Sequence, residues 1–220
     1  MIKHPAVSIM SGTHRPRWRG RIHIAAFAIS IPAVVGLLVL SPDPRARLAA
    51  GAFGLSLIAV YGVSAAYHTL ATTVRAQQIM RRADHSMIFI LIAGTYTPVC
   101  LLALPRSWSI PLLAAVWTLT AIGVCTKVLS TGWLMRASNW LYVVMGWLAI
   151  VALPVMLRTL RPSVLTLMVV GGALYTIGAA LFFLRRPDPH PEVFGYHEVW
   201  HTFTVLAGAS HFAMVALVVR

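Results

Sequence analysis

Charged side chains are scarce in this 220-residue chain. Asp, Glu, Lys and Arg make up 10% of the residues, and 59% of the residues are apolar. Ordinary soluble domains are about 45–50% apolar and about 25% charged. This small number of charged residues cannot cover the surface of a water-soluble fold. The composition therefore excludes a soluble globular domain and favours a protein surrounded by lipid.

Acidic residues and cysteines are rarer still. Five acids against 18 basic residues give a net charge of +13, which could indicate a nucleic-acid-binding protein. The basic residues stand at the ends of apolar runs, however, where they fix topology and meet anionic lipid head groups. We therefore expect membrane lipids, and no nucleic acid, as partners. The two cysteines both lie inside apolar runs and provide no disulfide framework.

Apolar runs recur at about 20 residues, the length at which a helix crosses a bilayer. They predict an all-α membrane protein, a seven-transmembrane-helix bundle over residues 22–220 that follows a basic N-terminal segment, residues 1–21. The first span is longer than a signal-peptide core of about 7 to 15 residues, so we expect it to remain as a signal anchor. The seven predicted spans are 22–40, 48–68, 84–104, 107–126, 137–157, 162–184 and 197–219.

Basic residues are divided unevenly between the two sides of the predicted bundle. Twelve of the 18 lie on the side of the N-terminus and six on the other side. Because cytoplasmic loops collect Lys and Arg, we predict a cytoplasmic N-terminus, and the odd number of spans then places the C-terminus outside. The two longer loops, residues 69–83 and 185–196, are both expected on the cytoplasmic side.

Histidines and one acid meet at the predicted cytoplasmic ends of three spans. His68 closes the second span, Asp84 opens the third, and His197 and His201 open the seventh. Because residues four apart share a helix face, His197 and His201 can point the same way, and Ser64 can accompany His68. Three histidines with an open fourth position are the ligand set of a catalytic zinc site. The pattern predicts a metal site in this layer.

Two interpretations of this cluster stay open. In the first, the histidines bind a dication and Asp84 supplies the nearby anion. In the second, the histidines only form hydrogen bonds across the bundle. Asp84 itself is either a functional acid, as its cost in a membrane indicates, or a boundary acid solvated by head groups or paired with Arg81 or Arg82.

Helical geometry excludes other histidines and acids from direct metal binding. His85 and Glu198 each lie one position from a proposed site residue, about 100° around the helix, so both should point away. His211 lies about 15 Å along the helix from His201, which is too far for a ligand. His23 is expected at the membrane interface of the first span.

The same residues stand in segments that resemble the hemolysin III-like proteins, bacterial relatives of the progestin and adipoQ receptors, which include the adiponectin receptors. The matching segments are "SAAYH" (64–68), "RADHSMIFILIAGTYTP" (82–98) and "HEVWHTFTVLAGASHF" (197–212). The resemblance implies a seven-helix bundle with a cytoplasmic N-terminus and a zinc ion near the cytoplasmic face. It places the three zinc ligands at His68, His197 and His201, the family's aspartate at Asp84 and its serine at Ser64.

The resemblance also suggests an activity. The receptor branch resembles lipid amidases of the ceramidase type, and the bacterial branch is associated with the hemolysin name and with membrane lipid homeostasis. Zinc makes water a strong nucleophile at neutral pH, Asp84 would accept its proton, and Ser64 would orient the water or the carboxylate. We predict a zinc-dependent hydrolase of acyl-linked (amide) membrane lipids in the bacterial cell membrane. A receptor-like sensor with a structural zinc and an ion or proton transporter are the alternatives.

Overall fold

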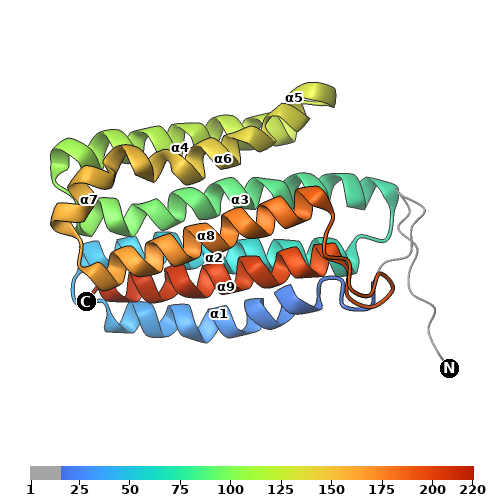
Figure 1. The fold of residues 1–220 in the computed structure, drawn as a ribbon, viewed down its shortest axis with the longest axis horizontal. Coiled ribbons are helices and arrows are strands. Elements are labelled where there is room, and N and C mark those ends of the chain that lie inside the picture. The colour runs from blue at the N-terminus through green and yellow to red at the C-terminus, as the bar shows by residue number, and fades with distance from the viewer. Residues whose placement is uncertain (1–15) are drawn as a thin grey trace.

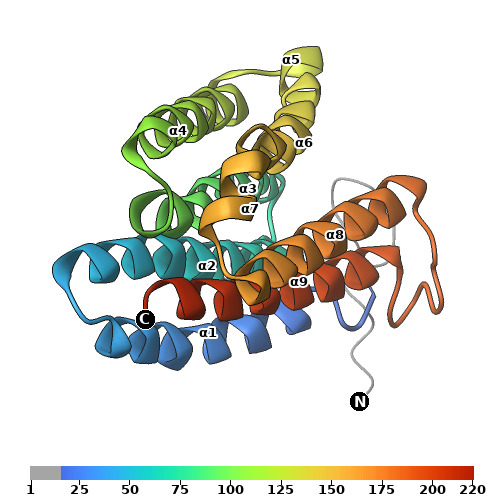
Figure 2. The same cartoon turned by 60° about the vertical axis from the view of Figure 1, so that its left-hand side comes forward.

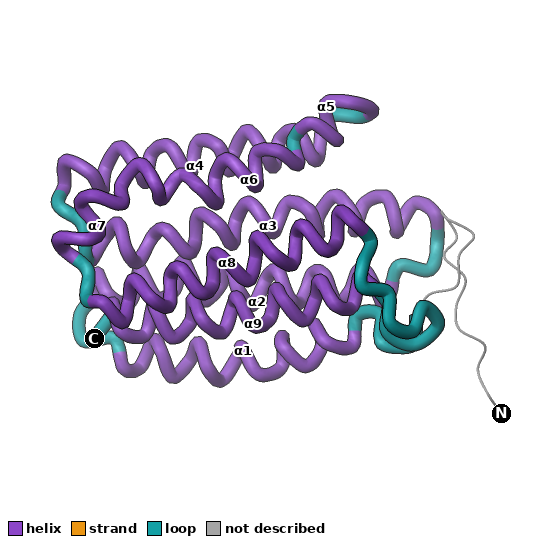
Figure 3. Tube along the Cα trace, in the orientation of Figure 1, coloured by secondary structure: helices purple, strands orange, loops and turns teal. Residues whose placement is uncertain are grey.

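The computed structural model describes residues 16–220, which form a bundle of helices (Figures 1 and 3). Over these residues there is no β-strand, and the nearest feature is an isolated bridge between His190 and Phe194. Seven helical stretches are long and apolar enough to cross a membrane, which confirms the predicted seven-span bundle. They are α1 (Arg21–Leu40), α2 (Pro44–Leu70), α3 (Val74–Leu102), α4 (Arg106–Leu129), a fifth span made of α5 (Gly132–Ala137), α6 (Asn139–Trp147), η1 (Leu148–Ala152) and α7 (Leu153–Thr159), then α8 (Pro162–Leu184) and α9 (Tyr196–Val218).

Two expectations about the N-terminus lie beyond this description. The predicted basic segment, residues 1–21, falls mostly outside the described residues. The predicted cytoplasmic position of the N-terminus and external position of the C-terminus stay predictions. The chain does place the start of α1 and the C-terminus at opposite ends of the bundle (Figure 1), as an odd number of spans requires.

The second and third spans form the interior of the bundle. α3 contacts α2, α4, α6 and α9, and Figure 2 shows α4 and α6 on one side of it and α1, α2, α8 and α9 on the other. In the most apolar stretch of α2 and of α3, 56% of the residues are buried, against 17% in the fifth span and 11% in α8. The fifth and sixth spans therefore leave most of their surface outside the packed interior of the bundle.

Small residues let α2 and α3 approach closely. A Cβ atom added to Gly94 would lie 2.2 Å from Ser56 Oγ and 3.1 Å from Ala52 O, so only glycine fits at this crossing. The Ser56 hydroxyl donates to Phe53 O at 2.7 Å, which satisfies it within α2. Contacts between small residues are a common way for membrane helices to associate. This contact fixes α2 against α3 about two turns from Ser64.

The third helix begins at Val74, ten residues before the predicted start at Asp84. The predicted long loop 69–83 is therefore wrong, because α2 ends at Leu70 and only three residues separate the two helices. Thr73 caps α3 by accepting a hydrogen bond from Ala76 N at 3.1 Å, as N-cap threonines do. Hydropathy marks where the apolar stretch of a helix ends, whereas caps and hydrogen bonds determine where the helix itself starts. Asp84 consequently lies about three turns inside α3.

Several basic residues that were assigned to loops lie on helices. Arg81 and Arg82 are on α3, and Lys127 is near the end of α4. Each remains at the end of the bundle where the sequence placed it, so the uneven distribution of basic residues is unchanged.

The fifth span, predicted over residues 137–157, is an interrupted helix. α6 passes into the 3₁₀ stretch η1, and α7 starts with Pro154 in its first turn, a position that proline favours because it lacks an N–H. Tyr96 on α3 satisfies the interrupted backbone: its Oη donates to Met145 O and accepts from Ala149 N, both at 2.8 Å. A neighbouring side chain thus replaces helix hydrogen bonds that hydrocarbon cannot provide.

Candidate metal centre

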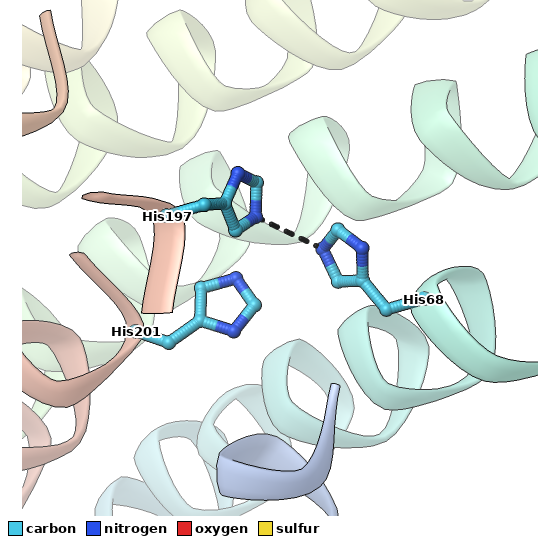
Figure 4. A group of neighbouring side chains, drawn as sticks. All are labelled: His68, His197 and His201. Carbon is cyan, nitrogen blue, oxygen red and sulfur yellow. Dashed lines mark hydrogen bonds between the residues drawn. The ribbon is translucent and has the colours of Figure 1, made fainter. Parts of the chain in front are cut away.

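Three histidines converge where α2 ends and α9 begins, which we call the histidine end of the bundle. His68 lies in the last turn of α2, and His197 and His201 lie in the first two turns of α9. Their ring centroids are 4.6 to 5.0 Å apart, and one ligand atom from each lies within 4.8 Å of the other two. Figure 4 shows the rings gathered between the two helices. The predicted convergence of these histidines is confirmed.

One pair of ring nitrogens is spaced as in a site that shares one metal ion. His197 Nε2 and His68 Nε2 are 3.2 Å apart, and two imidazole nitrogens bound to one tetrahedral ion at about 2.0–2.1 Å are about 3.3 Å apart. A hydrogen bond is also compatible with this distance, but it joins only one pair of rings. His201 Nδ1 is buried without a hydrogen-bond partner among residues 16–220, so bonds within the protein do not fully satisfy this ring. The cluster can therefore hold a metal ion.

A serine and an aspartate lie beside this cluster. Ser64 is buried one helical turn before His68 on α2, and its side chain lies near enough to the Asp84 carboxyl on α3 to interact with it. Asp84 is half-buried and is not one of the converging ligand atoms. The structure thus joins the two predicted catalytic residues into a pair next to the histidines, and their catalytic roles stay a prediction.

The segment before α1 packs against the same cluster. Gly20 has a φ of +81°, and a Cβ atom added to it would lie 2.9 Å from His68 Cβ. Arg19 Nε forms an ion pair with Glu198, whose side chain is 1% exposed, and the same carboxylate accepts a hydrogen bond from Gly195 N at 2.9 Å. Glu198 therefore points away from the metal cluster, as helical geometry predicted. It fixes the start of α9 to the chain that precedes α1.

The two other histidines excluded on helical geometry lie elsewhere. His85 lines a cavity between α3, α4 and the start of the fifth span. His211 packs against Gly171 of α8, and its Nε2 lies 3.4 Å from Met168 O. Neither belongs to the group of converging ligand atoms.

His23 contacts the cluster in a way that the sequence did not indicate. Its expected place at the membrane interface stays a prediction, and within the bundle it is buried and its ring stacks on His201, with centroids 3.8 Å apart and an interplanar angle of 4°. Its Nε2 lies 3.1 Å from Thr204 Oγ1, and Thr204 in turn donates to His201 O at 2.8 Å. His23 and Thr204 therefore hold the His201 ring and backbone. No spacing in the sequence indicates this contact, because the two histidines lie on the first and last spans.

Comparisons with known proteins cover most of the chain. A family model described as "Haemolysin-III related" matches residues 11–212. Hemolysin-3 of Bacillus cereus is 34% identical over 187 residues, which span 83% of this chain and 81% of that protein. The Hemolysin-3 homolog of Bacillus subtilis (strain 168) is 31% identical over 196 residues, 88% of this chain and 89% of that protein. The region matched by the family model includes the three converging histidines, Ser64 and Asp84.

Proposed function

Because this chain belongs to the haemolysin-III related family of multi-pass bacterial membrane proteins, we propose that it is a zinc-dependent hydrolase of acyl-linked membrane lipids. The observation that carries the proposal is the juxtaposition of a three-histidine cluster with a neighbouring serine–aspartate pair. Either feature alone has simpler explanations. Together they provide a set of metal ligands and an acid that is not one of them.

The donor set supports zinc. The three converging ligands are all imidazoles, which suit zinc and several other transition metals, and three histidines with an open position are typical of catalytic zinc. Bound zinc would supply Lewis acidity and a strongly nucleophilic water at neutral pH.

The remaining chemistry falls to residues of the chain itself. Asp84 would accept the proton of the attacking water and return it to the leaving group. Ser64, next to the Asp84 carboxyl, would hold it in place by donating a hydrogen bond. His23, stacked on His201, would keep that ligand from turning. These groups lie on helices that cross the membrane, so the substrate they suit is an acyl-linked lipid, and the ceramidase-type resemblance of the receptor branch favours an amide bond.

Metal analysis of the purified full-length protein tests the proposal. We expect about one zinc per chain, loss of that zinc in His197→Ala and His201→Ala, and release of fatty acid from an amide-linked lipid in a lipid panel. His211→Gln is the matched control, because it changes another histidine of α9 that is outside the cluster and should keep zinc and activity. A metal-free preparation that remains active would overturn the proposal.

A receptor-like role with a structural metal is the second candidate, and one observation favours it. α2 and α9 make few direct contacts with each other, so an ion bound by His68 and His201 would join two spans that otherwise meet mainly through α1 and α3. In that case Asp84→Asn would leave function intact, and loss of a histidine would reduce the stability of the bundle. Ion or proton transport, the third alternative, is not favoured by any contact described above.

A further inference from the structure

Lys127, in the last turn of α4, is a cation with only 1% of its surface exposed. Its Nζ donates to Met135 O at 2.9 Å and to Asn139 Oδ1 at 2.6 Å, and it lies 5.2 Å from the centroid of the Tyr142 ring. None of these partners is an anion, and Lys127 has no ion pair within residues 16–220. A buried charge without a counter-charge is costly, so these contacts alone do not explain why a lysine is present.

A cavity of about 170 Å³ adjoins Lys127 between α3, α4 and the start of the fifth span. No acidic side chain lines it in the described part of the chain, and the positive charges of Arg81 and Lys127 are close enough to repel each other. Like charges held around one space raise the free energy unless an anion offsets them. The charged and polar side chains of the lining are Arg81, Arg82, His85, Lys127, Arg136 and Asn139.

We propose that this basic cavity binds the phosphate of an anionic phospholipid head group. Its volume exceeds that of several water molecules, at about 30 Å³ each, so the five heavy atoms of a phosphate fit. Arginine presents a planar fork of donors that matches phosphate, and lysine adds a point charge. The arrangement is therefore suited to phosphate, and basic pockets between membrane helices are known to receive anionic head groups.

The position of the cavity favours a lipid as the source of the phosphate. Trp133 on α5 and Trp140 on α6 are 72% and 70% exposed, and both flank residues of the lining in sequence. Tryptophan is enriched at the level of the head groups in membrane proteins. The cavity is also at the histidine end, which the distribution of basic residues predicts to be cytoplasmic, where anionic lipids are concentrated.

This site is separate from the metal centre, although both border α3. Asp84 is paired with Ser64 of α2, whereas the adjacent His85 lines the basic cavity. Tyr142 of α6 donates to His85 O at 2.9 Å and links the cavity to this part of α3. A change confined to the cavity should therefore leave the metal content unchanged.

Binding of dioleoyl phosphatidylglycerol to the purified full-length protein in detergent tests the proposal, with dioleoyl phosphatidylcholine as the neutral comparison. The variant is R81Q/R136Q. Arg81 is half-buried and Arg136 is exposed, so the loss of these side chains should not unfold the bundle. The matched control is R158Q/R161Q, which removes one charge from the last turn of α7 and one from the link to α8, at the opposite end. Native mass spectrometry measures the lipid bound, and metal analysis accompanies it.

We expect the wild type to prefer phosphatidylglycerol to phosphatidylcholine, and R81Q/R136Q to raise the apparent Kd for phosphatidylglycerol about tenfold or more. The control should bind as the wild type does, and all three proteins should carry the same metal. Equal weakening in both double variants, or no preference for the anionic lipid, would overturn the proposal. If inorganic phosphate or glycerol 3-phosphate displaces the lipid at equal concentration, the assignment to a lipid is wrong and the ligand is a free phosphate.

Discussion

Two groups of polar side chains border α3 at the histidine end, and they differ in how their charges are balanced. On the side of α2 and α9, the converging rings are imidazoles and the nearby charges of Arg19 and Glu198 neutralise each other. On the side of α4 and α6, Arg81, Lys127 and Arg136 line one cavity that has no acidic side chain among the described residues. The first side is suited to a cation and the second to an anion. One helix thus separates two groups of side chains that suit ligands of opposite charge.

The largest expected effect concerns the acid between these sites. We expect Asp84→Asn to reduce lipid hydrolysis by about 10²- to 10⁴-fold, the usual contribution of a general base, because an amide cannot accept the proton of the attacking water. The variant should keep its zinc, since Asp84 is not among the converging ligand atoms. Product release and zinc content are measured on the same preparation. Full activity in this variant would favour the structural-metal alternative.

The next prediction tests whether the Arg19–Glu198 ion pair beside the metal centre holds the segment before α1 in place. Arg19→Gln leaves the carboxylate of Glu198 buried without its counter-charge, which typically costs about 3–5 kcal/mol. We expect a loss of that order in the free energy of unfolding, and we expect R19Q/E198Q to recover most of it because no buried charge then remains. Chemical unfolding in detergent measures both. If the single variant is as stable as the wild type, the pair does not hold the segment before α1 in place.

A smaller effect is expected at Gly20, whose backbone touches the metal-ligand helix. Gly20→Ala places a side chain at a φ of +81° and 2.9 Å from His68 Cβ, so we expect a loss of about 1–2 kcal/mol of stability and weaker zinc binding. Gly36→Ala on α1 is the control, because no atom lies within 4 Å of its added Cβ and alanine favours a helix. Zinc titration with a competing chelator compares the two variants, and equal zinc affinities would show that Gly20 does not position His68.

The fold was predictable from sequence to the extent that it depends on apolar length and helical period. The predicted bounds of the sixth span, 162–184, agree with α8, and the first span differs by one residue. The start of α3 was missed because its first turns are polar. Hydropathy detects only the apolar part of a helix and gives no sign of turns that extend beyond the membrane. The break in the fifth span depends on Tyr96, which comes from another helix, so hydropathy along the span does not indicate it.

The candidate site also contains contacts that the sequence predicted and contacts that it did not. His197 and His201 share a face because they are four residues apart, and His68 joins them because alternating spans bring the end of α2 to the start of α9. The stacking of His23 on His201 and the burial of Lys127 depend on the rotation of one helix against another. Single-helix periodicity contains no information about that rotation, so neither contact was predicted.

The smallest expected change in stability is at Lys127. It distinguishes the basic cavity on one side of α3 from the metal centre on the other. Lys127→Met removes a buried charge that has no counter-ion among residues 16–220, so we expect lipid-free protein to stay within about 1 kcal/mol of the wild type, as such apolar replacements often do. The stabilisation that phosphatidylglycerol gives the wild type should disappear in this variant. Chemical unfolding with and without the lipid measures both quantities. If Lys127→Met loses as much stability as Arg19→Gln, the bonds to Met135 and Asn139 are what keep the lysine buried, and the cavity needs no anion to explain it.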